Sequence, residues 1–432
     1  GFRYELDLRQ RPAEAVLFLA GKSKIDALWV NGISVDLPDG PIATNLMSRI
    51  ELRGLKRGRN TLAVRASADN TLIPGAGIGG QLRLKYKNGS IQRLTSSKSW
   101  KTAFVRDDSW TASGFKDSDW SEAAAPKIAP QTIPWITPAM YMRRDFVATK
   151  KIARARLYAT ALGAYEAHIN GARIGDAHMA PDYTNPSETL MYQVYDVTDV
   201  VRPGENTIGL WVGDGWYASH FSIAGRYCFG PAPRRVRAQL ELTYEDDATE
   251  YVTTDGDAWR VHQSPILYSD VYAGETYDAR LEQPGWAKEG FNEAPWNAAR
   301  SADGPEVPLR CQIGPRIRPI QIIPVARRTS PKPGVYVYDF GQNFSGWARL
   351  KAQGPAGTRV TMRFAEVLKA SGEIDQANLR TARATDAFIL AGTGSAESFA
   401  PRFTFHGFRY VELSGYPGEP PADALEGICA YS

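Results

Sequence analysis

The sequence contains few of the residues from which covalent or metal-based frameworks are built. Among its 432 residues there are 3 cysteines and 5 histidines. Cys228, Cys311 and Cys429 are odd in number and far apart, so they form neither a disulfide framework nor a CxxC metal motif. The histidines include no triad with metal-ligand spacing. The cysteines are therefore compatible with either an oxidising or a reducing compartment.

Long apolar runs and blocks of one charge are also missing. No segment approaches the ~20 consecutive apolar residues that a membrane-spanning helix needs. Lysine and arginine total 51 and aspartate and glutamate 47, which gives a formal net charge of +4. The basic residues are scattered along the chain. We therefore expect neither a membrane nor a nucleic acid among the partners of this protein.

Turn-forming and aromatic residues, by contrast, are plentiful. The chain has 39 glycines and 28 prolines, and its composition is 11% aromatic and 23% charged. This is the composition of a folded globular protein. A chain rich in turns, tryptophan and tyrosine, with few long helical patterns, is typical of β-sandwiches. At ~150 residues per domain, its length suggests about three domains.

Three motifs occur twice, in the same order, in the first two thirds of the chain. An alternating apolar segment broken by Asn-Gly, a strong hairpin signal, is found at Asn31-Gly32 and at Asn170-Gly171. A Gly-x-Asn-Thr motif follows each hairpin, and a Gly-Phe pair with a tryptophan five residues after the phenylalanine closes each unit. The later matches are Gly58–Thr61 with Gly204–Thr207, and Gly114–Trp120 with Gly290–Trp296. The repeat predicts two copies of one β-sandwich.

The repeat and the patterns after it define three predicted domains. We place the two copies at residues 1–134 and 135–308, and a third β-domain at residues 309–432. The last third contains alternating segments such as Val335–Asp339 and Phe408–Leu413, as expected for strands. The predicted fold is all-β, with tandem jelly-roll or galactose-binding-like sandwiches followed by a third sandwich.

The second copy is longer than the first at two places. The spacing between the hairpin asparagine and the asparagine of Gly-x-Asn-Thr is 36 residues in the second copy and 29 in the first. The additional residues fall around Ala180–Pro186, a segment rich in turn formers. The other addition includes Tyr268–Asp278, which is dense in aromatic residues and carboxylates. Loops added to a rigid sandwich are where binding sites usually develop.

Residues 135–432 contain nine short motifs. Each motif alone is a weak signal, but all nine in this order form a specific signature. They are Tyr165–Asp176, Tyr192–Thr198, Pro203–Asn206, Gly213–Tyr217, Gly274–Arg280, Asp339–Asn343 with Gly346-Trp347, Ala365–Leu368, Leu379-Arg380 with Ala384–Asp386, and Phe405–Val411. This series resembles the amino-terminal half of bacterial α-L-rhamnosidases of glycoside hydrolase family 78. The resemblance implies that the ligand is a glycan or glycoside containing L-rhamnose.

The resemblance assigns no catalytic residue to this chain. In such rhamnosidases an (α/α)6 barrel follows the sandwiches and carries the acidic pair for inverting hydrolysis, and the present sequence ends about where that barrel would begin. The catalytic barrel of the same protein is therefore the expected partner. Asp270, Glu275 and Asp278 share one loop, and Glu366 lies in another domain. For these carboxylates we expect loop-capping or interdomain roles.

The candidate sugar-binding residues lie in the second sandwich. A Gly-Asp-Gly-Trp-Tyr motif places Asp214, Trp216 and Tyr217 beside glycines that permit a tight approach. Aromatic rings contact the apolar side of a sugar, while carboxylates accept hydrogen bonds from its hydroxyl groups. Asp182 and Tyr183 lie on the inserted loop and complete the set. In the alternative interpretation, Trp216 packs in the core and Asp182 caps a turn.

A calcium ion is implied by the resemblance alone. Some relatives use this sandwich as a rhamnose-binding module that contains calcium. On that basis Asp182 is the first candidate ligand, followed by Asn185 and Asp214. Oxygen donors have the right chemistry for calcium, although the sequence contains no EF-hand spacing. The loop after Tyr217, residues 218–225, lacks the Arg-Gly that many relatives carry there.

Three functional hypotheses follow from these observations. The first is the non-catalytic, carbohydrate-binding and scaffolding half of an α-L-rhamnosidase-like hydrolase that releases terminal α-L-rhamnose. The others are a stand-alone rhamnose-binding, lectin-like protein and an accessory region of a lyase acting on rhamnose–glucuronate polysaccharides. A periplasmic or secreted location is favoured over a cytoplasmic one.

Two further expectations concern structural roles. His406, alone in a strand-rich stretch, is expected to be a hydrogen-bonded structural group rather than a metal ligand. Trp120 and Trp296 occupy matched positions in the repeat. We expect both tryptophans in hydrophobic cores.

Overall fold

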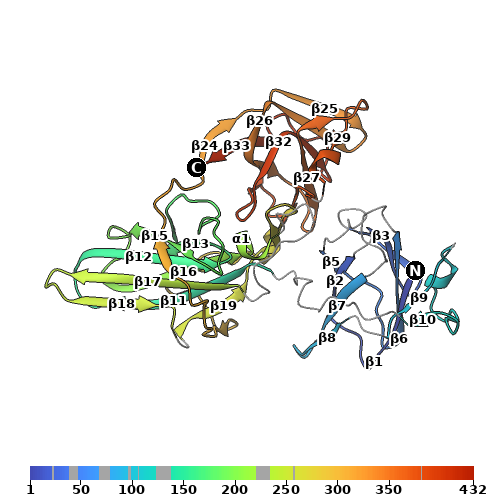
Figure 1. Cartoon of the computed structure of the whole chain (residues 1–432), viewed down its shortest axis with the longest axis horizontal. Helices are drawn as coiled ribbons and strands as arrows, with labels where there is room; N and C mark the ends of the chain where they lie inside the picture. The colour runs from blue at the N-terminus through green and yellow to red at the C-terminus, as the bar shows by residue number, and fades with distance from the viewer. Residues whose placement is uncertain are drawn as a thin grey trace. The chain divides into compact units, whose positions relative to one another are not determined.

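The computed structural model describes residues 1–21, 24–37, 47–67, 78–95, 99–105, 107–122, 138–219, 234–255, 258–380 and 382–432. These residues are almost entirely β-structure, and the one α-helix among them is the single turn α1 (Gly215–Ala218). The predicted all-β class is therefore confirmed. The described residues divide into two compact units, 1–122 and 138–432, which appear in blue to cyan and in green to red in Figure 1.

Unit 1 is a sandwich of two antiparallel sheets. In spatial order the first sheet contains β10 (Ser121–Glu122), β9 (Lys101–Thr102), β1 (Phe2–Leu8), β6 (Gly58–Ser67), β3 (Lys24–Val30) and β4 (Ile33–Val35). The second contains β5 (Met47–Glu51), β2 (Glu14–Gly21), β7 (Ile78–Lys85) and β8 (Ile91–Thr95). A 3₁₀ turn, η1 (Ser109–Thr111), carries the buried Trp110, against which Trp120 packs.

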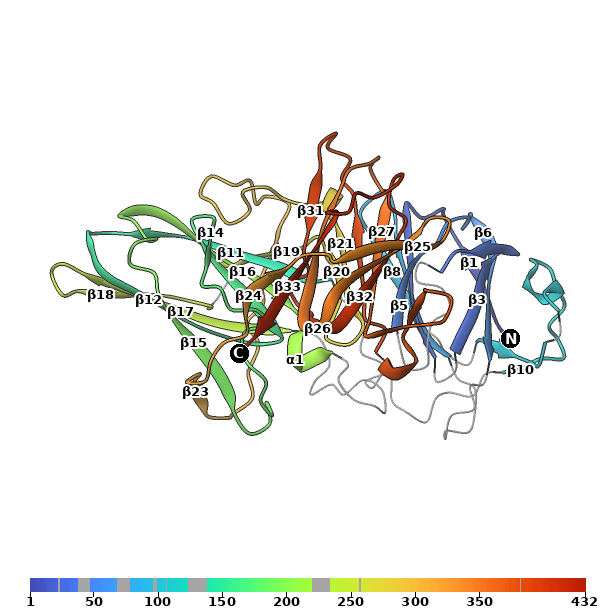
Figure 2. The same cartoon turned by 90° about the horizontal axis from the view of Figure 1, so that it is seen from above.

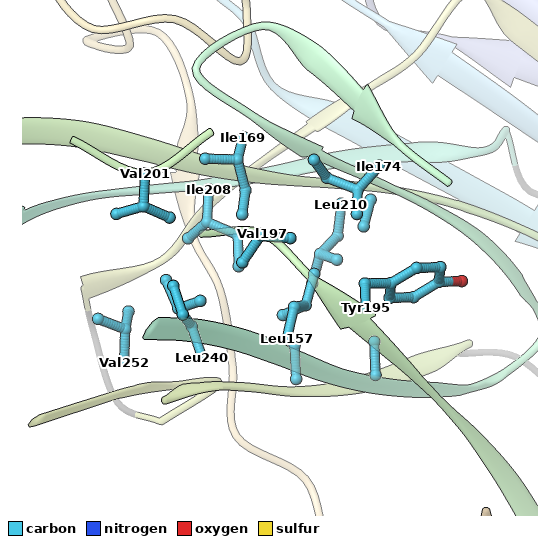
Figure 3. Close-up of a cluster of buried hydrophobic side chains, with 14 of the residues drawn as sticks. Leu157, Ile169, Ile174, Tyr195, Val197, Val201, Ile208, Leu210, Leu240 and Val252 are labelled. Carbon is cyan, nitrogen blue, oxygen red and sulfur yellow. The ribbon is translucent and has the colours of Figure 1, made fainter. Parts of the chain in front are cut away.

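Unit 2 begins with a second sandwich. Its first sheet contains β14 (Ala172–Ile174), β13 (Ala164–Ile169), β16 (Gly204–Gly213), β11 (Met140–Ala148), β19 (Arg260–Gln263) and β22 (Asn297–Ala298). Its second contains β18 (Thr249–Thr253), β17 (Arg235–Tyr244), β12 (Ile152–Leu162), β15 (Leu190–Asp196) and β23 (Leu309–Cys311). Inward-facing aliphatic residues such as Leu157, Ile208 and Leu240 form the core between the sheets (Figure 3), because alternate strand residues share one face.

A third sheet completes unit 2. In spatial order it contains β20 (Ile266–Asp270), β21 (Gly274–Asp278), β30 (Thr385–Ile389), β27 (Arg359–Ala365), β32 (His406–Ser414), β26 (Val335–Ala352), β33 (Leu425–Tyr431) and β24 (Arg318–Ile323). Strands β25 (Arg327–Lys332) and β31 (Glu397–Phe399) pair with β26, and β28 (Val367–Leu368) pairs with β29 (Ile374–Asp375). The short turns η4 (Ala279–Leu281) and η5 (Ala377–Leu379) connect strands. Figure 2 shows the long strand β26 beside β32 and β33.

Strands are exchanged across the predicted boundary between residues 308 and 309. The hairpin β20–β21, from the stretch assigned to the second sandwich, belongs to the third sheet, where β21 pairs in parallel with β30. Conversely, β23 pairs in parallel with β15 of the second sandwich. The two parts of unit 2 are thus tied together by backbone hydrogen bonds, and the exact domain limits stay a prediction.

The repeated asparagines make the same hydrogen bonds in both sandwiches. Asn31 Nδ2 donates to Asn60 Oδ1 at 3.1 Å, and Asn170 Nδ2 donates to Asn206 Oδ1 at 2.8 Å. In each copy Oδ1 of the hairpin asparagine accepts the backbone N–H of the threonine after the second asparagine, at 2.9 Å. Asn31 and Asn170 both have positive φ, 53° and 52°, which asparagine tolerates better than most residues. The motif therefore fixes a hairpin against the neighbouring strand.

A buried arginine, which is not part of the three repeated sequence motifs, also occurs in both sandwiches. The side chains of Arg3 and Arg143 are both 0% exposed. Each guanidinium pairs with carboxylates and lies over the repeated phenylalanine, Phe115 at 5.7 Å and Phe291 at 5.5 Å. Such cation–π contacts strengthen when the cation is removed from water. The Gly-Phe motif thus places a ring against a buried charge.

Buried polar groups join the second sandwich to the third sheet. Glu166 in β13 forms an ion pair with Arg402 (2.7 Å), and the burial of Glu166 is outweighed by nearby cations, Arg402 first, so its pKa lies far below the ordinary value. His178 Nε2 lies 2.8 Å from the carbonyl oxygen of Thr404, and its ring stacks on Trp347 with centroids 4.1 Å apart. Burial lowers the pKa of His178 to about 4. This interface therefore holds a neutral histidine beside a charged pair.

Candidate carbohydrate-binding site

Close packing explains the two glycines that flank Asp214 at the end of β16. A Cβ atom at Gly213 would collide with the ring of Phe403, and one at Gly215 would lie 2.5 Å from the Cβ of Ala164. Gly215 also has φ of +49°, a left-handed conformation that glycine adopts at little cost. The space beside these two glycines is therefore filled by atoms of Phe403 and Ala164. The left-handed conformation of Gly215 directs the chain into α1.

Asp214 lies in the interior beneath α1. Its side chain is 4% exposed and forms an ion pair with Arg234, which also donates to the carbonyl oxygen of Pro138. The backbone N–H of Asp214 donates to Ser269 Oγ at 3.2 Å. A buried carboxylate needs such partners because desolvating a charge is costly. A sugar or calcium contact from Asp214 stays a prediction.

Three of the predicted residues, Asp182, Trp216 and Tyr217, line one small pocket. The pocket lies between α1, the turn from β12 to β13, and the inserted loop, and α1 can be located in Figure 2. Its lining residues are Ala161, Leu162, Gly163, Pro181, Asp182, Thr184, Pro186, Leu190, Trp216 and Tyr217. The cavity volume is about 20 Å³, which accommodates about one water molecule. A sugar ring would therefore lie across the mouth of the pocket.

Tyr183 and Trp216 provide aromatic surface at this mouth. Their rings meet edge to face with centroids 5.9 Å apart, and Tyr183 is 49% exposed. On its other side, half-buried Trp216 packs edge to face against Phe405 at 5.8 Å. The indole N–H of Trp216 is buried and has no hydrogen-bond partner among the described residues. Trp216 therefore both packs against Phe405 and lines the pocket.

A chain of hydrogen bonds orients Asp182 from the core of the second sandwich. Tyr165 OH donates to Gln193 Oε1 (2.7 Å), and Gln193 Nε2 donates to Gln312 Oε1 (2.7 Å). Gln312 Nε2 then donates to Asp182 Oδ2 at 3.3 Å. Asp182 Oδ1 accepts the backbone N–H of Tyr183 at 2.7 Å, as in the turn-capping interpretation. The carboxylate remains half-exposed at the pocket, where its remaining acceptor capacity faces solvent.

Asn185 lies on the same loop but outside the pocket. Its Oδ1 accepts the backbone N–H of Ser187 at 3.1 Å, and its side chain is exposed. In the part of the chain that the structure describes, no three His, Cys, Asp or Glu side chains are grouped to hold a metal ion. Asp182 and Asn185 nevertheless present oxygen donors, the class that calcium prefers. A calcium ion at this loop stays a prediction.

The carboxylates of Tyr268–Asp278 lie on the paired strands β20 and β21 and not on one loop as predicted, and they have structural partners. Asp270 Oδ1 accepts two backbone N–H groups of its own turn, and Asp278 caps η4 while pairing with Arg280 at 2.7 Å. Glu275 accepts the backbone N–H groups of Arg402 and Phe403. Burial raises the pKa of Glu275 to about 8. The expected loop-capping and interdomain roles are confirmed for these carboxylates.

The structural role expected for His406 is also confirmed. His406 is 4% exposed, and its Nε2 lies 3.1 Å from Asp386 Oδ1. Its ring stacks on Phe364 with centroids 4.2 Å apart. Trp296 is buried too, at 6% exposure. The loop that lacks Arg-Gly, apart from residues 218 and 219, lies outside the described residues.

Comparison with known proteins identifies the family. The model for the α-L-rhamnosidase N-terminal domain matches residues 150–321, and that for the bacterial α-L-rhamnosidase concanavalin-like domain matches residues 329–431. This chain belongs to the bacterial α-L-rhamnosidase family. An α-L-rhamnosidase of Streptomyces avermitilis is 44% identical over 379 residues, which cover 86% of this chain and 36% of that protein. One from Formosa agariphila is 35% identical, covering 68% and 32%.

Solved rhamnosidase structures share the fold. The crystal structure of Streptomyces avermitilis α-L-rhamnosidase complexed with L-rhamnose matches 100% of this chain and 42% of its own, with a TM-score of 0.83 and 40% identity. The α-L-rhamnosidase from Dictyoglumus thermophilum matches 99% and 45%, with a TM-score of 0.65 and 30% identity. This rhamnosidase-family chain thus spans about a third of the length of its curated relatives. Among its described residues, no helix is long and apolar enough to cross a membrane.

Proposed function

We propose that this chain is the carbohydrate-binding and scaffolding region of an α-L-rhamnosidase-like glycoside hydrolase, with L-rhamnose bound by the second sandwich. The observation that carries this proposal is the meeting of Asp182, Trp216 and Tyr217 at one pocket in a rhamnosidase-family chain. Inverting hydrolysis of a terminal α-L-rhamnoside would belong to a helical barrel of the same polypeptide. The third sheet, tied to the second sandwich by exchanged strands, would support that barrel.

The chemistry of the pocket suits a deoxy sugar. L-rhamnose has a methyl group and an apolar ring side, which the exposed ring of Tyr183 and the edge of Trp216 can contact. Asp182 offers acceptor capacity to two neighbouring hydroxyl groups, and the Gln312 contact holds its carboxylate in place. If calcium binds, Asp182 and Asn185 would hold it, and the ion would supply a positive centre for sugar hydroxyl groups. Because the cavity is small, most recognition would occur at its mouth.

Calorimetric titration of the 432-residue chain with L-rhamnose tests this proposal. We expect saturable binding in the millimolar range or tighter. Asp182→Asn keeps the side-chain volume but removes the charge, so it should weaken binding about tenfold or more. The matched control is Asp199→Asn, at an exposed carboxylate of the same sandwich outside the pocket. Lack of any heat at millimolar rhamnose, or equal binding by Asp182→Asn, would contradict the proposal.

Two further measurements address calcium and catalysis. If calcium bridges the sugar, a chelator should reduce rhamnose affinity and added calcium should restore it, whereas affinity unchanged by chelation would exclude a bridging ion. The chain by itself should not hydrolyse an aryl α-L-rhamnoside. Robust turnover by the purified 432-residue chain would show that the non-catalytic assignment is wrong.

A further inference from the structure

The sequence contains a third Asn-Gly pair, which lies outside the repeated motifs. Asn88-Gly89 is at the tip of the hairpin that joins β7 to β8, and both strands are labelled in Figure 1. Within this tip the N–H of Tyr86 donates to the carbonyl oxygen of Ser90 at 3.0 Å. Residues 87–90 are all exposed, and a Cβ atom on Gly89 would meet nothing within 4 Å. Water and dissolved bases therefore reach this peptide bond freely.

The side chain of Asn88 folds back onto its own turn. Asn88 Oδ1 accepts the backbone N–H of Ser90 at 3.0 Å and the hydroxyl of Ser90 at 2.7 Å. A bond from a side-chain oxygen to the N–H two residues later is an Asx turn. The ring that this bond closes includes the backbone nitrogen of Gly89, so the side-chain carbon Cγ of Asn88 is held near that nitrogen.

The asparagines of the two repeated Asn-Gly hairpins are held away from their own backbone. Asn31 Nδ2 donates to the carbonyl oxygen of Gly54 at 3.1 Å. Asn170 Nδ2 likewise donates to the carbonyl oxygen of Val200 at 2.9 Å. With the asparagine and threonine contacts of the motif, each side chain makes three hydrogen bonds to groups at least 23 positions away in the sequence. Neither amide can turn toward the following glycine nitrogen unless these bonds break.

We propose that Asn88 is a site of spontaneous deamidation assisted by Ser90, and that Asn31 and Asn170 are protected from this reaction. A base first takes the proton of the Gly89 backbone nitrogen, whose electron pair then forms a bond to Cγ of Asn88. The bond between Cγ and Nδ2 breaks, and Nδ2 takes up a proton and leaves as ammonia. The product is a cyclic succinimide, and its formation requires neither an oxidant nor a cofactor.

Water completes the modification by adding to either carbonyl carbon of the succinimide and opening the ring. Opening at one carbon gives aspartate at position 88. Opening at the other gives isoaspartate, in which the backbone continues through the side-chain carbon. Either product carries a carboxylate, so it lowers the formal net charge of +4 by one. Isoaspartate also lengthens the backbone inside the turn that Tyr86 and Ser90 close.

The hydrogen bonds from Ser90 act where negative charge develops. Attack on Cγ places charge on Oδ1 of Asn88, the atom that already accepts both bonds. Donors fixed at such an oxygen stabilise the transition state. One bond opposes the reaction, because the N–H of Gly89 donates to the carbonyl oxygen of Tyr86 at 2.9 Å. Bonds in exposed loops open at little cost in free energy, so the hairpin tip needs one such opening where each repeated hairpin needs three.

Peptide mapping by mass spectrometry measures deamidation at all three Asn-Gly pairs in one sample of the full chain. In the folded protein at mildly alkaline pH, Asn88 should deamidate about 30-fold faster than Asn31 or Asn170, the effect of two fewer broken hydrogen bonds. In urea the three sites should react at similar rates, because a glycine follows each asparagine. This comparison separates protection by the fold from a difference in local sequence.

Variants of the hairpin tip test the role of Ser90. Ser90→Ala removes the hydroxyl donor but keeps the backbone donor, so deamidation at Asn88 should slow about 3- to 10-fold. The matched control is Ser118→Ala, at an exposed serine of the same unit, which should leave the rate unchanged. Asn88→Gln lengthens the side chain by one carbon and should abolish the modification at this position. Similar rates at the three sites in the folded chain, or an unchanged rate in Ser90→Ala, would overturn the proposal.

Discussion

His178 shows how a single buried residue makes the stability of unit 2 depend on pH. Its folded-state pKa of about 4 lies below the ordinary histidine value of 6.5 because burial opposes the imidazolium, while the contact with the Thr404 carbonyl oxygen acts in the opposite direction. As pH falls below 6.5, the unfolded chain binds a proton that the folded chain does not. The stability that the neutral His178 contributes is therefore fully present above pH 6.5 and is lost as pH falls toward 4.

We predict that unit 2 loses about 2 kcal/mol of unfolding free energy between pH 7 and pH 5 through His178 alone. His178→Gln keeps a hydrogen-bond donor without this titration, so lowering the pH from 7 to 5 should cost the variant about 2 kcal/mol less unfolding free energy than it costs the wild type. Chemical denaturation at several pH values measures the difference. The depressed pKa of Glu166 acts only below the ordinary value of 4.5. Glu275, with its pKa raised to about 8, changes stability over this interval in the opposite direction, but it does so in both proteins and cancels in their difference. Parallel pH profiles of the two proteins would contradict the prediction.

Gly346 and Gly407, on paired strands, provide a matched test of backbone packing. A Cβ atom at Gly346, where φ is +150°, would collide with the carbonyl oxygen of Ile428, whereas one at Gly407 has open space. Gly346→Ala should therefore destabilise unit 2 by about 2 kcal/mol or more, and Gly407→Ala by about 0.5 kcal/mol or less. Thermal unfolding of the two variants compares them directly. Equal losses would show that the close approach to Ile428 relaxes at little cost.

At the scale of elements, the repeated asparagine motif is the strongest predictor of structure in the sequence. Its Asn-Gly hairpins and Gly-x-Asn-Thr strands form as predicted because the signals are local, and the side chains satisfy nearby backbone groups. The exchange of β20–β21 and β23 between sheets could not be predicted. Pairing between strands about a hundred residues apart leaves no trace in hydrophobic alternation.

The asparagine motif also predicts that the same substitution lowers the free energy of unfolding by a similar amount in the two sandwiches. Asn60 and Asn206 are 0% and 1% exposed, and each makes three hydrogen bonds to its own preceding loop. Asn60→Ala and Asn206→Ala should each cost about 2–4 kcal/mol, because buried backbone groups lose their partners. Urea unfolding of each variant tests this, with the loss confined to the unit that carries the change. A loss below about 1 kcal/mol in either copy would show that the motif is not structural there.

Part of the candidate site, like part of the fold, could be predicted from the sequence. Asp182, Trp216 and Tyr217 were placed together because the inserted loop and the Gly-Asp-Gly-Trp-Tyr motif follow the same sandwich, and the structure groups them at one pocket. The ion pair of Asp214 with Arg234 was not predictable, since sequence does not reveal which distant cation reaches a carboxylate.

At the scale of the whole molecule, the described residues form two compact units, of which the second carries the proposed sugar-binding pocket. We therefore predict that residues 138–432, produced alone, fold and bind L-rhamnose with an affinity within about twofold of the full chain. Circular dichroism and calorimetry measure folding and binding. A folded fragment that binds much more weakly would show that unit 1 contributes to the site.

The most direct test of the central claim is a crystal structure of this chain grown with millimolar L-rhamnose. We predict electron density for one sugar ring at the mouth of the pocket near α1, against Tyr183 and Trp216 and within hydrogen-bond distance of Asp182. An empty pocket at saturating rhamnose, or a sugar bound on unit 1 instead, would contradict the account.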